Sequence, residues 1–248
     1  IMKIDKSKIK VGPSESMSKS KKNTVDPETM IKQYGADAVR WFILSDSPPE
    51  KDVQWSDTGV VSANKFLQKI WNLNQLILNK KDDKTINKTI EKSFNNKIDL
   101  YVYKIDSTIN NFQFNVAIAQ FYEVYRFFNE TINQEINKKV FVMNIIKIMK
   151  LMIPFTPHLA NECLHNLECK ETNSWPTIDS KIISNIQVNM VVQINGKTRD
   201  VINIKKDLIE SDVHKLVNTY PKVKKHLLNK TIVKTIFIKN KIINYIAN

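Results

Sequence analysis

The chain has 248 residues, of which 38 are lysine or arginine and 25 are aspartate or glutamate, so its formal net charge is +13. That length allows one large domain or two to three small ones. The positive charge favours a polyanionic partner, although the abundant isoleucine, lysine and asparagine fit compositional drift equally well. Two cysteines exclude a disulfide framework, and no apolar run reaches the ~20 residues of a membrane-spanning helix. We therefore expect a cytoplasmic protein without a membrane span.

The most informative stretch is a cationic run near the start of the chain, Ser16-Met17-Ser18-Lys19-Ser20-Lys21-Lys22-Asn23. Its lysines alternate with small hydroxyl residues, which donate hydrogen bonds to phosphate oxygens. Beyond the run, Asp26 suits a helix N-cap and Pro27 suits the first helical position. The run therefore predicts a phosphate-handling loop that leads into a helix. Composition alone favours an ordinary solvated surface loop. The order of the residues therefore has to distinguish a solvated loop from a phosphate-handling one.

That order resembles the second signature, KMSKS, of class I aminoacyl-tRNA synthetases. The motif and the downstream helix match together, because Tyr34-Gly35-Ala36-Asp37-Ala38-Val39-Arg40 follows Asp26-Pro27. The likeness continues through residues 47–57 and Ala63-Asn64-Lys65-Phe66-Leu67 to Trp71, where it resembles leucyl-tRNA synthetases of the bacterial type. The resemblance implies ATP-dependent attachment of leucine to tRNA(Leu) through leucyl-adenylate.

The resemblance also implies roles for residues of the loop. Those it assigns to ATP binding are Met17, Ser18, Lys19 and Ser20. Lys19 is the expected catalytic residue, contacting the ATP phosphates while leucine attacks the α-phosphorus and pyrophosphate leaves. A compact ammonium group suits negative charge that grows and moves on the phosphate oxygens during the reaction. ATP is expected as a substrate, and Mg²⁺ is expected to accompany it. Ser16 stands where the family motif has its first lysine, so Lys21 or Lys22 would have to supply part of the missing charge.

The family's other signature, His-x-Gly-His, belongs to a nucleotide-binding sheet upstream of the loop. The four histidines of this chain are followed by Leu159, Asn166, Lys215 and Leu227, so none of them fits that motif. We therefore expect the C-terminal part of a longer ligase, inactive alone, with the leucine pocket, adenine site and any editing domain outside it. The expected partners are tRNA(Leu), leucine and ATP, and the expected state is a monomer.

The periodicity of apolar residues predicts helices up to residue 172. After a loosely alternating arm over residues 2–11, two short helices are expected over 27–34 and 36–44. Longer helices are then expected over approximately 56–77, 86–110, 114–128, 140–153 and 158–167. The inward positions of the first long helix are Val60, Ala63, Phe66, Leu67, Ile70, Leu73 and Ile77. The aromatic residues of the helix over 114–128 are assigned to the core rather than to base stacking.

Four residues near the last of these helices invite comparison with a zinc site: His158, Cys163, His165 and Cys169. Residues 158, 165 and 169 can share a helical face, but residue 163 lies away from it. Tetrahedral zinc needs ligands that converge from two elements. We therefore predict no metal site in this chain.

Beyond residue 185 the pattern changes from helices to strands. The residues that alternate with polar or exposed positions are Val188, Met190, Val192 and Ile194. Asn195-Gly196 follows them and is the strongest two-residue signal for a β-hairpin. Two helices and one or two further strands are expected after the hairpin, which predicts a small α/β domain.

The hairpin run from Gln193 to Arg199 resembles the C-terminal domain of bacterial leucyl-tRNA synthetases, which contacts the outer corner of tRNA. The resemblance implies that Lys197 and Arg199 bind tRNA. Contacts through the sugar–phosphate backbone are expected, because the few aromatic residues of the domain are scattered. Solvated strand positions are an equally good explanation for each of the two residues alone.

The predicted protein is multidomain and mainly α-helical. Its expected parts are the end of a class I catalytic domain with the signature loop over 1–55, a helical anticodon-binding-type bundle over 56–172, a linker over 173–185 and a small α/β C-terminal domain over 186–248. Two alternatives stay open. A class I synthetase for valine, isoleucine or methionine should lack the hairpin run, and a free-standing tRNA-binding module without catalysis has little reason to retain the signature loop.

Overall fold

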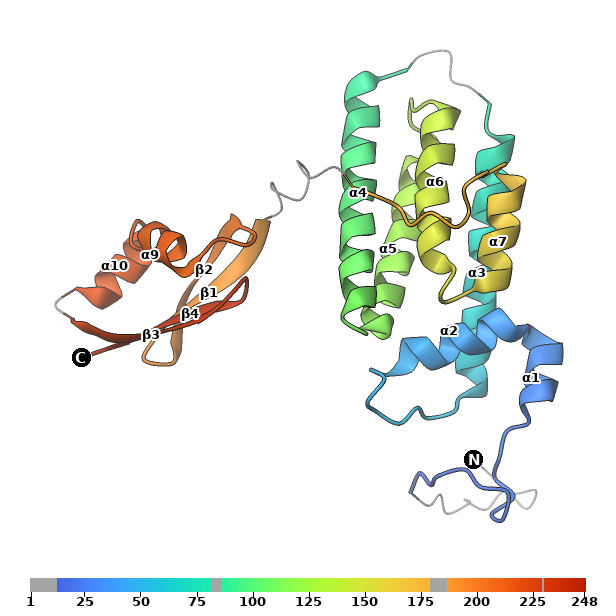
Figure 1. Cartoon of the computed structure of the whole chain (residues 1–248), viewed down its shortest axis with the longest axis horizontal. Coiled ribbons are helices and arrows are strands. Elements are labelled where there is room, and N and C mark those ends of the chain that lie inside the picture. Colours follow the sequence, from blue (N-terminus) through green and yellow to red (C-terminus); the bar gives the residue numbers. More distant parts are fainter. Residues whose placement is uncertain (1–12, 82–85, 179–186, 229) are drawn as a thin grey trace, which may run out of the picture. The chain divides into compact units, whose positions relative to one another are not determined.

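The computed structural model of the chain describes residues 13–81, 86–178, 187–228 and 230–248 (Figure 1). The chain divides into two compact units, Ile1–Thr177 and Ile178–Asn248. In the described ranges the first unit contains helices only, and the second combines two helices with a four-stranded sheet. The expected mainly helical chain with a small sheet is therefore confirmed. The arm expected over residues 2–11 lies outside the described residues.

Two short helices follow the cationic loop, and their bounds are Pro27–Tyr34 for α1 and Ala36–Asp46 for α2. The Asp26 carboxylate accepts hydrogen bonds from the backbone N–H groups of Glu28 and Thr29, which lack partners inside the helix. Gly35 separates the two helices with a φ of 84°, a conformation that glycine adopts without a Cβ clash. Both helices agree with the sequence prediction, and α2 ends two residues later than expected.

Five further helices are described in the first unit. Their bounds are Asp57–Asn79 for α3, Lys88–Asn110 for α4, Phe114–Thr131 for α5, Lys138–Met152 for α6 and Pro157–Asn166 for α7. Ser56 caps α3, and all seven positions predicted to face inward on this helix are buried. No helix in the described ranges is both long and apolar enough to cross a membrane.

The indole of Trp41 joins α2 to the bundle. It is fully buried, and its ring centroid lies 5.3 Å from that of Phe66 on α3 and 5.8 Å from that of Phe121 on α5. Phe155, in the turn between α6 and α7, lies 6.2 Å away with its ring edge toward the indole. Offset and edge-to-face aromatic pairs of this kind stabilise a core beyond the area that they bury. The second helix after the cationic loop, α2, is thus built into the core of the bundle.

The second unit is a twisted sheet with the strand order β2-β1-β4-β3 (Figure 1). The strand bounds are Gln187–Ile194 for β1, Lys197–Lys205 for β2, Ile232–Ile238 for β3 and Ile242–Ala247 for β4. Strands β1 and β2 form the predicted hairpin, and Asn195 and Gly196 both have the positive φ values that a tight hairpin turn requires. Strand β4 pairs with β1 in parallel and with β3 antiparallel.

Two helices, α9 (Glu210–Val217) and α10 (Pro221–Leu227), cover one face of this sheet. Val213, Val217 and Val223 on the helices pack with alternate residues of the strands, so the second unit has its own apolar core. Both helices and both later strands agree with the α/β unit expected from the sequence.

Gly59 provides a test of how closely α2 and α3 approach each other. A Cβ atom at this position would lie 2.5 Å from a ring carbon of the buried Phe42. We expect Gly59→Ala to lower the free energy of unfolding by about 1–3 kcal/mol, although alanine favours a helix. Urea unfolding followed by tryptophan fluorescence reports on the first unit, which contains all four tryptophans.

The matched control is Gln68→Ala at an exposed position of the same helix. This control should change the stability by less than about 0.5 kcal/mol. A Gly59→Ala protein that is as stable as the parent would show that the two helices are not in close contact.

Candidate functional site

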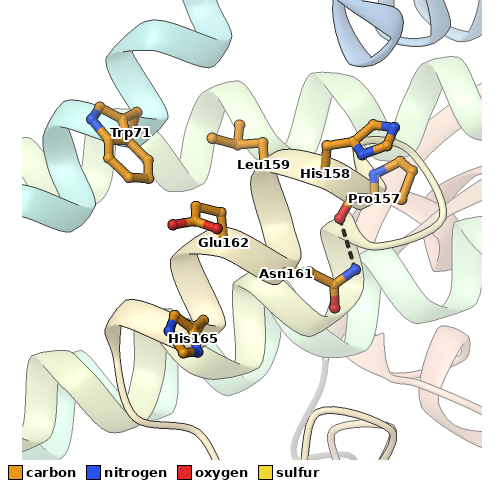
Figure 2. A pocket seen from close by; sticks show the side chains of 7 residues that line it. All are labelled: Trp71, Pro157, His158, Leu159, Asn161, Glu162 and His165. Atoms are coloured by element: carbon orange, nitrogen blue, oxygen red, sulfur yellow. Dashed lines mark hydrogen bonds between the residues drawn. The ribbon is translucent and has the colours of Figure 1, made fainter.

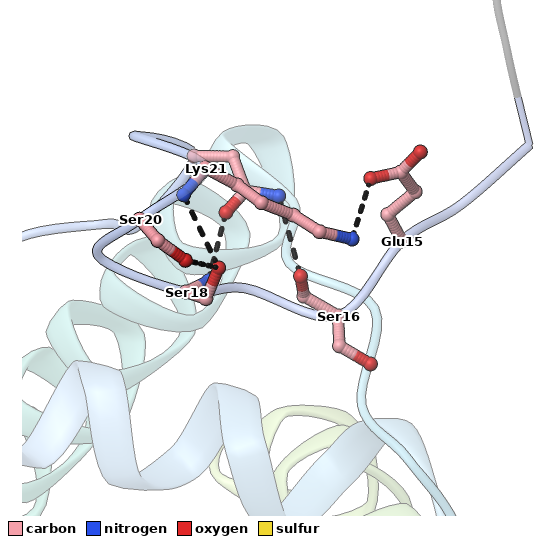
Figure 3. A network of polar contacts seen from close by, with 6 residues as sticks. Glu15, Ser16, Ser18, Ser20 and Lys21 are labelled. Carbon is pink, nitrogen blue, oxygen red and sulfur yellow. Dashed lines mark hydrogen bonds and ion pairs between the residues drawn. The ribbon is translucent and has the colours of Figure 1, made fainter.

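The cationic loop is closed by its own side chains (Figure 3). The backbone N–H of Ser18 donates to Oδ1 of Asn23 at 2.8 Å, and Nδ2 of Asn23 donates to the carbonyl oxygen of Ser16 at 3.3 Å. The hydroxyl groups of Ser18 and Ser20 lie 3.2 Å apart. The structure therefore brings together the two serines that the sequence assigns to phosphate binding.

The lysines of this loop differ in their surroundings. Nζ of Lys21 lies 2.8 Å from a carboxylate oxygen of Glu15 (Figure 3). Lys19 is exposed in the turn over residues 19–22, and no residue in the described ranges pairs with its ammonium group. Met17 is 47% exposed. Lys21 is thus paired in this structure, and whether Lys21 or Lys22 supplies the charge of the lysine that Ser16 replaces stays a prediction.

One hydrogen bond connects the base of the loop to the segment between α2 and α3. Nε2 of Gln54 donates to Oγ of Ser14 at 3.3 Å. The loop otherwise has exposed side chains and hydrogen bonds within itself. It is thus carried by α1 and α2 rather than packed against the bundle.

The position of α2 is fixed by a carboxylate that caps another helix. Asp37 is buried, and its Oδ2 atom accepts a hydrogen bond of 2.7 Å from the backbone N–H of Leu159. Its Oδ1 atom accepts a longer one, 3.4 Å, from the N–H of His158. These two N–H groups belong to the first turn of α7, where a carboxylate is favoured by the free amides and the helix dipole.

One turn further along α2, Arg40 binds the other side of the connection between α6 and α7, which we call the α6–α7 corner. Nε of Arg40 donates to the carbonyl oxygen of Phe155 at 3.2 Å, and Nη2 donates to that of Pro154 at 2.5 Å. These carbonyls follow the C-terminal end of α6. Asp37 and Arg40 therefore form a clamp that holds the whole connection between α6 and α7 against α2.

A hollow of about 840 Å³ lies between α3 and α7 (Figure 2). Its lining residues are Trp71, Pro157, His158, Leu159, Asn161, Glu162 and His165. In the ranges that the structure describes, no group of three or more histidine, cysteine or acidic side chains is arranged to hold a metal ion. Cys163 points away into the core, and burial raises the pKa of its thiol to about 12.

The two residues assigned to tRNA binding in the second unit are not equally accessible. Lys197 is exposed at the start of β2. Arg199 is half buried where the register of β2 against β1 shifts, and its Nε atom is buried with no hydrogen-bond partner in the described part of the chain. The next residue, Asp200, pairs with Lys222 of α10 at 3.6 Å. Among the described residues no contact joins Lys197 to Arg199, and their role stays a prediction.

Residues 91–215, half of the chain, match the model of the anticodon-binding domain of tRNA ligases. The chain belongs to this family. A second family model, class I tRNA synthetases for isoleucine, leucine, methionine and valine, matches residues 9–56, which include the cationic loop.

Curated relatives of this chain are leucine–tRNA ligases. One from Prochlorococcus marinus subsp. pastoris is 37% identical over 98% of the chain and 29% of its own length. Another, from Fusobacterium nucleatum subsp. nucleatum, is 36% identical over 94% of the chain and 29% of its own length. The chain thus spans about three tenths of the length of these relatives. The likeness confirms the predicted resemblance to leucyl-tRNA synthetases.

A solved structure supports the fold. The ternary complex of Agrobacterium radiobacter K84 agnB2 LeuRS with tRNA and LeuAMS matches 94% of this chain and 31% of its own chain with a TM-score of 0.64. The sequences are 24% identical, so this likeness shows a shared fold.

Sequence reasoning missed two features of the first unit. Asp37 and Arg40 stand in the run that carries the family resemblance, but nothing in the local pattern shows that they bind a corner more than 110 residues away. Tyr125, assigned to the core, is half buried, and Tyr122 beside it is 42% exposed. An aromatic residue next to an inward position on a helix is the only signal that could have marked Tyr122.

The clamp gives a prediction for stability. We expect Asp37→Ala to lower the free energy of unfolding by about 2 kcal/mol, because it leaves two amides of α7 without their acceptor. Asp37→Asn retains one acceptor oxygen and should lose less. The measurement is urea unfolding of the chain followed by tryptophan fluorescence.

Asp46→Ala is the matched control, since this carboxylate is exposed at the other end of α2. It should leave the unfolding midpoint nearly unchanged. If Asp37→Ala and Asp46→Ala have equal effects, the capping role of Asp37 is wrong.

Proposed function

We propose that this chain is the part of a leucine–tRNA ligase that carries the signature loop for ATP and the surfaces for tRNA. The observation that carries the proposal is the ammonium group of Lys19, which is exposed and without an ionic partner among the described residues, in a loop whose serine hydroxyls converge. The match to leucine–tRNA ligases over 98% of the chain supports leucine as the amino acid. The enzyme would act as a cytoplasmic monomer.

In the proposed activation step, a carboxylate oxygen of leucine attacks the α-phosphorus of ATP. The bond from that phosphorus to the bridging oxygen breaks, and the electron pair leaves with pyrophosphate. Lys19 would stabilise the negative charge that grows on the phosphate oxygens, while the hydroxyls of Ser18 and Ser20 donate hydrogen bonds to them. Met17 would complete the ATP-binding run. Mg²⁺ would arrive with ATP and share the same charge.

We assign the proposed roles to consecutive segments of the chain. Residues 1–55 would end the catalytic domain, 56–172 would form the anticodon-binding bundle, and 186–248 would bind tRNA after a linker over 173–185. The last of these segments has 12 lysines and arginines against 4 aspartates and glutamates. Tyr245 in this unit is fully buried, which supports contact through phosphates rather than through stacked bases.

The signature loop provides the direct test of this function. In a leucine–tRNA ligase that contains this chain, Lys19→Ala should reduce leucine-dependent exchange of pyrophosphate into ATP by about 100-fold, which corresponds to about 2.7 kcal/mol of transition-state stabilisation. Binding of tRNA should change little. Lys51→Ala, an exposed loop lysine outside the motif, is the matched control. Exchange within a few-fold of the parent rate would refute the role of Lys19.

The second unit should contribute to transfer and not to activation. Removing residues 178–248, which form a compact unit of their own, is expected to weaken charging of tRNA(Leu) while pyrophosphate exchange stays nearly intact. The reason is that activation needs ATP, leucine and the loop around Lys19, whereas charging also needs docked tRNA. Both rates are measured on the same preparation. An equal loss of the two rates, or unimpaired charging, would contradict the assignment.

A further inference from the structure

The turn between β1 and β2 contains the sequence Asn195-Gly196, and Gly196 is the only one of the four glycines of the sequence that follows an asparagine. Both residues are exposed, and both have positive φ values. An asparagine amide is attacked most readily by the next backbone nitrogen when that residue is glycine, because glycine has no Cβ to obstruct the approach. By its sequence, Asn195 is therefore the asparagine of this chain that is most prone to deamidation.

In the folded second unit, the side-chain amide of Asn195 is held by β4. Its Nδ2 donates to the carbonyl oxygen of Ala247 at 2.8 Å, and its Oδ1 accepts from the N–H of Ala247 at 2.8 Å. The backbone N–H of Asn195 donates to the carbonyl oxygen of Tyr245, also at 2.8 Å. The side chain thus continues the parallel pairing of β1 with β4 after the main chain has turned away. We call the two hydrogen bonds to Ala247 the amide clip.

The nitrogen that would attack this amide is held by the same strand. The backbone N–H of Gly196 donates to Oδ1 of Asn244 at 3.2 Å. Deamidation requires this nitrogen to lose its proton and to approach Cγ of Asn195. Because both residues are exposed, burial does not keep water away from them. Protection of Asn195 therefore depends on the hydrogen bonds that β4 supplies.

We propose that Asn195 is a deamidation site that the amide clip keeps unreactive while β4 is paired. Once β4 opens, the Gly196 nitrogen gives its proton to water and bonds to Cγ of Asn195. The bond from Cγ to Nδ2 then breaks, and Nδ2 takes up a proton and leaves as ammonia. Water hydrolyses the resulting succinimide ring to aspartate or isoaspartate. The product carboxylate has no N–H to donate to the carbonyl oxygen of Ala247, so the clip cannot re-form.

The modification would make an opening of β4 permanent. Isoaspartate also lengthens the main chain of the two-residue turn, which the register of β1 against β2 does not accommodate. The altered residue would lie beside Lys197, in the segment to which the proposed function assigns tRNA contacts. The chemistry itself does not depend on that assignment.

The first test compares deamidation of the 248-residue chain in native buffer and in urea at the same pH, with each asparagine followed by peptide mapping and mass spectrometry. In urea, Asn195 should deamidate faster than Asn173, an exposed asparagine followed by serine. In the native chain this order should reverse, because deamidation of Asn195 then requires β4 to open and should slow about 100-fold. Similar rates at Asn195 in the two conditions would overturn protection by the clip.

The second test removes one hydrogen bond of the clip without changing Asn195. Ala247→Pro deletes the N–H that bonds to Oδ1, whereas Ala247→Val adds similar bulk and keeps this N–H. Under native conditions, Asn195 should deamidate about tenfold faster in the proline variant than in the valine variant, with equal rates at Asn173. Equal rates at Asn195 in the two variants, both shown to be folded by circular dichroism, would contradict the proposal.

A second variant decides the case in which the proline variant does not fold. Asn244→Ala frees the N–H of Gly196 and leaves the amide clip in place. It should accelerate deamidation of Asn195 about threefold over the parent chain, since one hydrogen bond to the attacking nitrogen is lost. An unchanged rate would show that β4 does not restrain this nitrogen, and the proposal would fail.

The third test examines the product. Asn195→Asp should raise the hydrogen-exchange rate of β4 amides about fivefold, because the carboxylate opposes the carbonyl oxygen of Ala247. Asn189→Asp places the same charge at an exposed position of β1 outside the clip and is the matched control. Equal exchange in the two variants would refute the loss of the clip on deamidation. None of these measurements involves tRNA or ATP, so failure of the deamidation site and failure of the proposed function give different results.

Discussion

The hydrogen bonds from Asp37 and Arg40 to the corner between α6 and α7 hold the signature loop to the rest of the first unit. A corner of this kind exposes free amides on one side and free carbonyls on the other. A carboxylate and a guanidinium one turn apart on α2 satisfy both sets, and hydrogen bonds to charged groups are worth about 1.5–3 kcal/mol each. The clamp, together with the buried Trp41, makes α2 part of the bundle and not an appendage.

The loop itself is built differently from the helices that carry it. Its hydrogen bonds are local and exposed. At its base, Gln54 donates a hydrogen bond to the hydroxyl of Ser14. A loop with few buried contacts opens at a low free-energy cost, which suits the role in phosphate handling proposed for this loop. The loop leads into α1, which Gly35 joins to the clamped α2, whereas Lys19 itself has no ionic partner among the described residues.

Much of the fold follows from local patterns in the sequence. The seven inward positions of α3 follow the helical period, Asp26 caps α1, and Asn195-Gly196 turns the hairpin, because each signal lies within a few residues of the structure that it specifies. The clamp could not be predicted in this way, since Asp37 and Leu159 are 122 residues apart. The ion pair of Lys21 with Glu15 and the half-buried position of Arg199 also depend on the folded backbone.

Helix α3 connects the features of the first unit. Phe66 on its inward face packs against Trp41, and Trp71 lines the hollow beside α7. Lys65 and Lys69 line a groove between α3 and α5. Because α2 packs on α3 and is clamped to α7, these three helices belong to one packed body, to which α1 attaches the cationic loop.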